Sequence, residues 1–167
     1  MGMNSDISFA LNGEPVAWSG NPASRLLEVL REEFRNTGVK CGCKEGECGA
    51  CAVILDGMLI NSCLTAMGRV EGSEIITIEG YKKTSRFAAL NEAFASVGAS
   101  QCGFCTPGMI MAAEALLSKN PDPTETEVRV GISGNLCRCT GYNAIVNAIL
   151  IAAKEGKGLW STTRQPA

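Results

Sequence analysis

The sequence predicts an α+β protein in two parts, a strand-rich N-terminal half followed by a helical C-terminal half. Alternating apolar residues and two hairpin turns mark residues 1–79. Apolar residues at three- and four-residue spacing mark residues 85–160. Residues 80–84 form the predicted linker, and residues 161–167 form a polar tail. A chain of 167 residues is long enough for two small domains.

Two hairpins, one helix and a last strand account for the N-terminal half. The first hairpin spans residues 7–18 and turns at Asn12-Gly13, a strong hairpin signal. Residues 23–34 carry leucines at helical spacing and predict a helix. A second hairpin is expected over residues 52–60 and a final strand over 75–78. Strands around one helix, with a cysteine loop after that helix, are the β-grasp arrangement of plant-type ferredoxins.

The C-terminal half predicts a small four-helix bundle. The four helices are expected near residues 87–97, 109–117, 124–132 and 145–153. Thr124 followed three residues later by Glu127 is a capping box, which predicts the start of the third helix. Asn120-Pro121 ends the second helix. The two halves show no internal repeat, so the two cysteine groups did not arise by duplication of one another.

Eight of the nine cysteines fall into two quartets with different spacings. The first quartet is Cys43, Cys48, Cys51 and Cys63, and the second quartet is Cys102, Cys105, Cys137 and Cys139. Four thiolates are the ligand set of a [2Fe–2S] cluster, and C-x4-C-x2-C with a distant fourth cysteine is the plant-type spacing. Two quartets in one short chain predict two one-electron carriers.

Other uses of cysteine fit the first quartet less well. Disulfides are typical of exported chains, and the N-terminal residues show no basic segment followed by an apolar core. Structural zinc usually takes two C-x2-C pairs or includes histidine, and the chain has no histidine. The second quartet by itself fits zinc as well as iron, and the first quartet is what favours iron there. A Rieske cluster is excluded because it requires two histidines.

Glycines in the first cysteine loop indicate how a cluster would be held. Gly42, Gly46 and Gly49 alternate with the cysteines and let the loop curl so that backbone N–H groups point at sulfur. Cys41 could replace Cys43 as a ligand, but only Cys43 gives the four-residue spacing. Cys41 is therefore left without a predicted role.

Helix starts follow the second quartet. Thr106-Pro107 comes directly after Cys105, and Thr140-Gly141 comes directly after Cys139. Two helix N-termini would then face an anionic cluster and stabilise its charge. Arg138 either adds positive charge there or points into solvent.

Three segments carry a family resemblance that covers nearly the whole chain in the same order. They are GCKEGECGACAVILDGMLINSC (42–63), QCGFCTPGM (101–109) and GNLCRCTGY (134–142). With them the chain resembles the small iron–sulfur subunit of the xanthine oxidase family of molybdenum hydroxylases, which includes enzymes of the xanthine dehydrogenase, aldehyde oxidoreductase and carbon monoxide dehydrogenase types. Cys41 departs from the family's pattern, and this puts no ligand in doubt.

The resemblance implies a non-catalytic electron-transfer subunit of a larger oxidoreductase. A large subunit would bind a molybdenum–pterin cofactor, and a medium subunit would bind FAD. The second quartet would hold the cluster nearest molybdenum, and the first quartet the outer cluster on the way to flavin. Gln101 and Cys139 match positions that contact the pterin. The expected assembly is a heterotrimer or a dimer of heterotrimers.

Composition excludes several other functions. A net charge of −2 gives no indication of nucleic-acid binding, and no apolar run approaches the ~20 residues of a membrane span. The sequence has no phosphate loop, dinucleotide fingerprint or nucleophile elbow. A cytoplasmic location is expected. The alternatives are a free-standing two-cluster ferredoxin and a zinc-binding scaffold.

The substrate is left open by the sequence. A purine-like or other N-heterocyclic substrate is favoured, with an aldehyde or carbon monoxide as alternatives. Leu159-Trp160 lies in a polar, glycine-rich segment, which predicts a tryptophan buried in a partner's groove. Folding back onto the chain's own bundle is the alternative for that ring.

Overall fold

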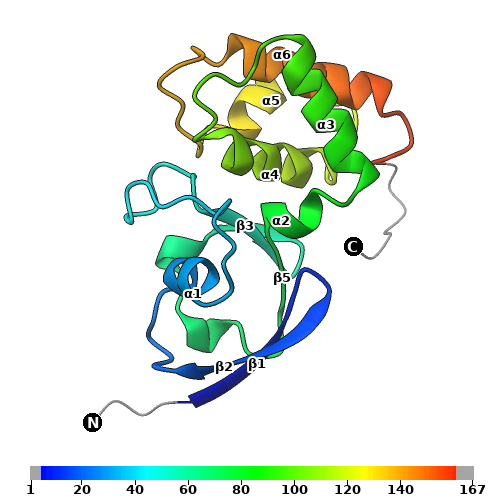
Figure 1. Cartoon of the computed structure of the whole chain (residues 1–167). Coiled ribbons are helices and arrows are strands. Elements are labelled where there is room, and N and C mark those ends of the chain that lie inside the picture. Colours follow the sequence, from blue (N-terminus) through cyan, green and yellow to red (C-terminus); the bar gives the residue numbers. More distant parts are fainter. Residues whose placement is uncertain (1–4, 161–167) are drawn as a thin grey trace.

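The computed structural model describes residues 5–160 and contains one mixed sheet and six helices (Figure 1). The elements are β1 (Ser5–Leu11), β2 (Glu14–Gly20), α1 (Leu26–Glu32), β3 (Ala52–Leu55), β4 (Met58–Asn61), the 3-10 turns η1 (Ser62–Leu64) and η2 (Met67–Arg69), β5 (Glu74–Ile76), α2 (Ile78–Tyr81), α3 (Ser85–Ser96), α4 (Thr106–Leu117), α5 (Glu125–Gly131) and α6 (Asn143–Glu155). Helices α3 to α6 gather on one side of the molecule, and α1 lies with the sheet on the other. The predicted α+β class is confirmed.

The sheet has the order β2-β1-β5-β3-β4. Strands β1 and β5 pair in parallel, and the other neighbours are antiparallel. Both predicted hairpins are present. Asn12 and Gly13 have φ of 55° and 85°, and Asp56 and Gly57 have φ of 48° and 77°. Positive φ at both central residues is the geometry of the tight turns that match the twist of paired strands.

Two predicted elements are shorter than expected. The last strand ends at Ile76 because the Asn12 side chain accepts the Thr77 N–H at 2.8 Å, so this N–H does not extend the sheet. Ile78 then begins α2 instead of continuing the strand. Helix α1 begins at Leu26 because Arg25 forms an isolated β-bridge with Ala66. The observed helix therefore covers only the middle of the range 23–34 that the sequence predicted.

Strand β3 is buried on both faces and connects the two halves. Val53 and Leu55 pack in a core with α1, whereas Ala52 and Ile54 pack in a second core with the helices of the C-terminal half. Alternate residues of a strand point to opposite faces, so one strand serves both cores. The apolar run of β3 reflects this double burial, since a strand with one face in water would alternate.

The helical half follows the predicted pattern. The capping box of α5 is formed, with Thr124 and Glu127 each accepting from the other's backbone N–H. The segment predicted as a linker is compact, because Tyr81 is buried at the end of α2 and Thr84 caps α3. The division of the chain at 79 and 85 remains a prediction, and the predicted tail 161–167 lies outside the described residues. Every helix in residues 5–160 is too short or too polar to cross a membrane.

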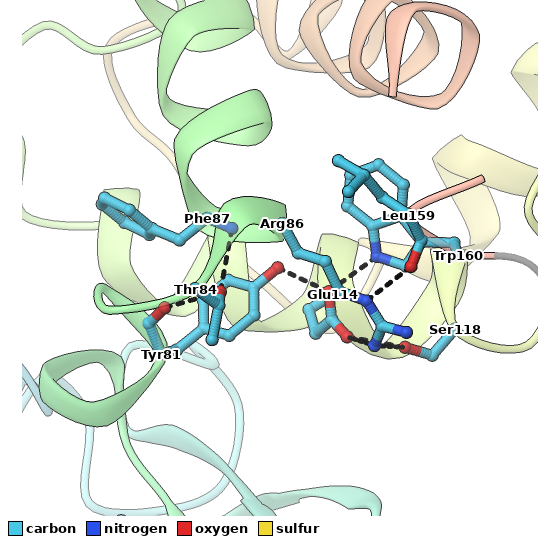
Figure 2. A network of polar contacts seen from close by, with 8 residues as sticks. All are labelled: Tyr81, Thr84, Arg86, Phe87, Glu114, Ser118, Leu159 and Trp160. Atoms are coloured by element: carbon cyan, nitrogen blue, oxygen red, sulfur yellow. Dashed lines mark hydrogen bonds and ion pairs between the residues drawn. The ribbon is translucent and has the colours of Figure 1, made fainter. Parts of the chain in front are cut away.

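A buried carboxylate, Glu114 in α4, joins three segments of the chain (Figure 2). Arg86 of α3 forms an ion pair with it at 2.9 Å, and Tyr81 of α2 donates its hydroxyl to it. Burial, and then the Glu114 charge, raise the pKa of Tyr81, which therefore stays protonated and donates. Trp160 donates its indole N–H to the same carboxylate at 2.7 Å.

The prediction that a partner's groove buries Trp160 is wrong. Its ring is 2% exposed within the chain's own helical core. Arg86 also donates to the Leu159 carbonyl at 2.8 Å, which ties this segment down at a second point. Glu114 is buried, and a buried carboxylate needs several hydrogen-bond donors. The indole N–H of Trp160 is one of these donors, so its partner lies inside the bundle.

We expect Trp160→Phe to lower the free energy of unfolding by about 1.5–3 kcal/mol, because a buried charge loses one hydrogen bond. Urea unfolding of the purified chain, followed by circular dichroism, measures this change. The matched control is Trp18→Phe in β2, where the indole donates no hydrogen bond within residues 5–160. Equal losses in the two variants would contradict the role given to the Glu114 contact.

Candidate metal centres

The first quartet lies where the loop after α1 meets the start of β3. Cys43 and Cys48 are partly exposed in the loop, Cys51 is buried next to β3, and Cys63 is buried in η1. Gly46 and Gly49 have φ of 81° and 65°, so the predicted tight curl of the loop is present at these two positions. The structure thus brings the four predicted cysteines to one end of the sheet.

Backbone N–H groups in this loop point at sulfur. The N–H groups of Cys48 and Glu45 both donate to the Cys43 Sγ at 3.4 Å, and the Cys43 N–H donates to the Cys48 Sγ at 3.4 Å. The Glu45 N–H, and next the Cys48 N–H, lower the pKa of the Cys43 thiol to about 6. Such donors favour a negatively charged sulfur.

Cys51 and Cys63 form the other, deeper pair. Burial, and then the neighbouring Cys51 thiol, raise the pKa of Cys63 to about 11. Asn61 fixes the loop above this pair, since its amide donates to the Gly46 carbonyl at 2.8 Å. The quartet is therefore arranged as two pairs of thiols, one near the surface and one buried.

The second quartet lies in two turns that precede helices. Cys102 and Cys105 come before α4, and Cys137 and Cys139 come before α6. The Cys139 and Cys102 sulfur atoms are 3.7 Å apart at the surface. Burial, and then the Cys137 thiol, raise the pKa of Cys105 to about 12, so Cys105 and Cys137 form an inner pair. This quartet too consists of two pairs.

One hydroxyl donates to a sulfur of the second quartet. Thr140 Oγ1 lies 3.1 Å from the Cys137 Sγ. Burial alone raises the pKa of Cys137, but the Thr140 hydroxyl and the Thr140 and Cys139 N–H groups outweigh it and lower the pKa to about 7. In the sequence, Thr140 indicated only a helix start, and its contact with sulfur was not predicted.

Only one of the two predicted helix starts follows its cysteine directly. Helix α4 begins at Thr106, with Cys105 as its N-cap and Pro107 in its first turn. Helix α6 begins at Asn143, after Tyr142 in a left-handed conformation with φ of 70°. The Tyr142 hydroxyl accepts the Cys137 N–H at 2.9 Å, so this side chain reaches back from the start of the helix to the cysteine turn.

The paired thiols fit the ligand set of a [2Fe–2S] cluster. A [2Fe–2S] cluster takes two cysteines on each iron. All nine cysteines are free thiols, and Cys41 packs against the N-terminal core beside the first quartet. The donor type, number and pairing are those that the cluster requires.

The two quartets are held together by direct hydrogen bonds between their loops. The Leu136 N–H donates to the Cys48 carbonyl at 2.9 Å. The side-chain amide of Asn135, which is 4% exposed, donates to the Gly49 carbonyl at 3.0 Å. The role of Asn135 was not predicted from the sequence, where the one indication is a lone asparagine two residues before Cys137.

A pocket of about 370 Å³ lies over the second quartet. It is lined by Cys102, Phe104, Cys105, Leu136, Cys137, Arg138, Cys139 and Tyr142. Phe104 and Leu136 are 48% and 55% exposed, so two large apolar side chains lie together at the surface of one pocket. Arg138 lines this pocket at the surface, and Gln101 is exposed next to Cys102. The second quartet thus has an apolar surface around it, with the predicted pterin-contact residues at or beside its edge.

Two family models together match nearly all of the described chain. A model described as "2Fe-2S iron-sulfur cluster binding domain" matches residues 9–77, and one described as "[2Fe-2S] binding domain" matches residues 77–150. Each match contains one complete quartet.

Proteins of similar length are also similar in sequence. The nicotinate dehydrogenase small FeS subunit of Eubacterium barkeri is 50% identical over 89% of this chain and 95% of its own length. The xanthine dehydrogenase iron-sulfur-binding subunit of Escherichia coli O157:H7 is 48% identical over 89% of this chain and 94% of its own.

Solved structures agree with these relatives. A chain of quinoline 2-oxidoreductase from Pseudomonas putida 86 superposes with a TM-score of 0.84 and 42% identity, covering 92% of this chain and 98% of that chain. The aldehyde oxidoreductase of Desulfovibrio desulfuricans has a TM-score of 0.86 and 40% identity, but the match covers only 17% of its chain. The same fold therefore occurs both as a separate small chain and as part of a longer one.

We expect Thr140→Val to lower the midpoint potential of one cluster by about 20–60 mV, the equivalent of one hydrogen bond to sulfur. The sign follows because a donor stabilises the more negative, reduced state. An EPR-monitored redox titration measures the shift. Thr106→Val is the matched control, since its hydroxyl contacts Ser100 and no sulfur. A potential that rises or stays constant in Thr140→Val would contradict this assignment.

Proposed function

Because this chain belongs to the small iron–sulfur subunits of the xanthine oxidase family of molybdenum hydroxylases, we propose that it passes single electrons from a molybdenum–pterin centre on a partner subunit to flavin or another acceptor. The observation that carries this proposal is the pair of adjacent thiol quartets in one chain. The chain would take no part in the bond chemistry of the substrate. Each [2Fe–2S] cluster supplies one reversible electron-accepting site when bound.

We assign the ligands as two sets of four. Cys43, Cys48, Cys51 and Cys63 would hold one cluster, and Cys102, Cys105, Cys137 and Cys139 would hold the other. The pairing of thiols within each set and the N–H and hydroxyl donors to sulfur support this assignment. Cys41 would stay a free thiol.

The second quartet would face the molybdenum subunit. Its pocket combines exposed Phe104 and Leu136 with exposed thiols, and apolar groups of this kind are typical of surfaces that a partner covers. Gln101 and Cys139 would contact the pterin there, since both lie at the exposed edge of the quartet. Arg138 would add positive charge beside the anionic centres.

The first quartet would face the electron acceptor. Leu64, directly after Cys63, is 65% exposed and supports a second contact surface at that end of the chain. We propose a flavin subunit as this partner, in a heterotrimer or a dimer of heterotrimers, in the cytoplasm.

We propose an N-heterocyclic compound as the substrate of the complex. The support comes from the names of three relatives, which are nicotinate dehydrogenase, xanthine dehydrogenase and quinoline 2-oxidoreductase. Aldehyde oxidoreductases are also among the relatives, so an aldehyde is the alternative.

The chain purified with its partners should contain about four irons and four acid-labile sulfides, and two distinct EPR signals after reduction with dithionite. Cys43→Ser should remove one signal, and Cys137→Ser should remove the other, because each cysteine belongs to a different quartet. Cys41→Ser is the control and should keep both signals. Stoichiometric zinc without iron would contradict the proposal. A loss of both signals in every quartet variant would contradict the assignment of two separate ligand sets.

Phe104→Ser should weaken binding of the large molybdenum subunit by about 10-fold or more, because burial of a phenylalanine ring contributes roughly 1.5–3 kcal/mol. Titration calorimetry with the purified large subunit measures the change. Val130→Ser is the matched control, since Val130 is 68% exposed on α5 and does not line the pocket. Equal affinities of the two variants would place the docking surface elsewhere.

A further inference from the structure

The side chain of Asn135 connects the two loops that carry the quartets. Its amide nitrogen lies 3.0 Å from the Gly49 carbonyl oxygen, across 86 residues of sequence. The side chain is 4% exposed, so this hydrogen bond is shielded from water. It joins a residue one position after Cys48 to a residue two positions before Cys137.

Backbone segments approach closely around this hydrogen bond. A Cβ on Gly49 would lie 2.4 Å from the Gly134 carbonyl oxygen and 2.6 Å from the Asn135 Nδ2. A Cβ on Gly108, in the first turn of α4, would lie 2.5 Å from the Gly49 carbonyl oxygen. Glycine at both positions lets three segments meet without an intervening side chain. The amide of Asn135 then fixes how they meet.

The chemistry of the side chain also matters at this position. An aspartate of the same shape has no N–H for the Gly49 carbonyl and adds a negative charge between two anionic clusters. An alanine removes the donor that comes from the other loop, and leaves the Gly49 carbonyl with only the Ala52 N–H, at 3.1 Å, from its own half of the chain. Asparagine supplies the donor without a charge.

From this contact we propose that Asn135 is a positioning residue that sets the electronic coupling between the two clusters. The inference rests on the proposed function and deepens it. Asn135 fixes the loop of Cys48 against the loop of Cys137, and coupling between redox centres falls steeply with separation. The nearby hydrogen bond from the Leu136 N–H to the Cys48 carbonyl keeps its geometry only while the two loops stay in register.

Asn135→Ala in the assembled complex tests this role. We expect unchanged iron content and two cluster signals, together with a severalfold smaller magnetic splitting between the reduced clusters in low-temperature EPR. The rate of electron transfer between the clusters should fall severalfold in rapid-mixing measurements. A residue that only maintains the fold would alter iron content or unfolding and leave the splitting per intact pair of clusters unchanged.

A matched control removes an equivalent bond from another buried asparagine. Asn36→Ala deletes an amide donor to the Phe34 carbonyl, a contact made within the N-terminal half at 2.9 Å without a cysteine, and should leave the splitting unchanged. A second variant, Gly108→Ala, should reduce the splitting by pushing α4 away from the Gly49 carbonyl.

The possible outcomes separate this inference from the proposed function. Wild-type splitting in fully loaded Asn135→Ala overturns the inference and leaves the electron-transfer function intact. Loss of iron from both Asn135→Ala and Gly108→Ala also overturns it, because the contact would then serve cluster assembly. Absence of iron from the unsubstituted complex would overturn the proposed function itself.

Discussion

Burial of strand β3 on both faces is the constraint on which the rest of the structure depends. The strand contributes Val53 and Leu55 to the N-terminal core, and Ala52 and Ile54 to the helical core. Neither half can move relative to the other without exposing one of these faces to water. Cys51 directly precedes this strand, and α4, which follows Cys105, packs on it. The shared strand therefore brings both quartets to one element, and the hydrogen bonds of Asn135 and Leu136 set how their loops meet.

Charge explains much of the local structure around the quartets. Thiolates and the clusters they hold are negative. Within residues 5–160, neutral groups donate hydrogen bonds to cysteine sulfur, namely backbone N–H groups at Cys43 and the Thr140 hydroxyl at Cys137. Such donors stabilise negative charge and do not fix a counter-ion beside it, which suits sites that must change charge by one electron.

The helical half needs its own anchor, because the quartets occupy only one end of it. The Glu114 carboxylate provides this anchor by accepting from Tyr81, Arg86 and Trp160 (Figure 2). These residues come from the segment before the bundle, from α3 and from the segment after α6. Both ends of the bundle are thereby tied to α4, the helix that begins at the second quartet.

The sequence by itself determined the features that depend on neighbours in the chain. Both hairpins turn where Asn12-Gly13 and Asp56-Gly57 stand, and the Thr124 capping box opens α5, because these signals act over two to four residues. The spacing of the cysteines likewise indicated two groups of four, since ligand spacing within a loop is a local property.

Only the tertiary structure decided the contacts between distant segments. Trp160 looked unpartnered in a polar segment, yet its partner, Glu114, lies 46 residues away in another helix. Asn135 gave no local signal, because its partner Gly49 lies 86 residues away and the bond exists only once β3 has brought the two halves together. The end of the last strand at Ile76 was hidden for the same reason, since the Asn12 side chain that takes the Thr77 N–H lies 65 residues away. The spacing of residues in the sequence predicts which local element a segment can form. Which polar groups find hydrogen-bond partners elsewhere in the chain depends on how distant segments pack together.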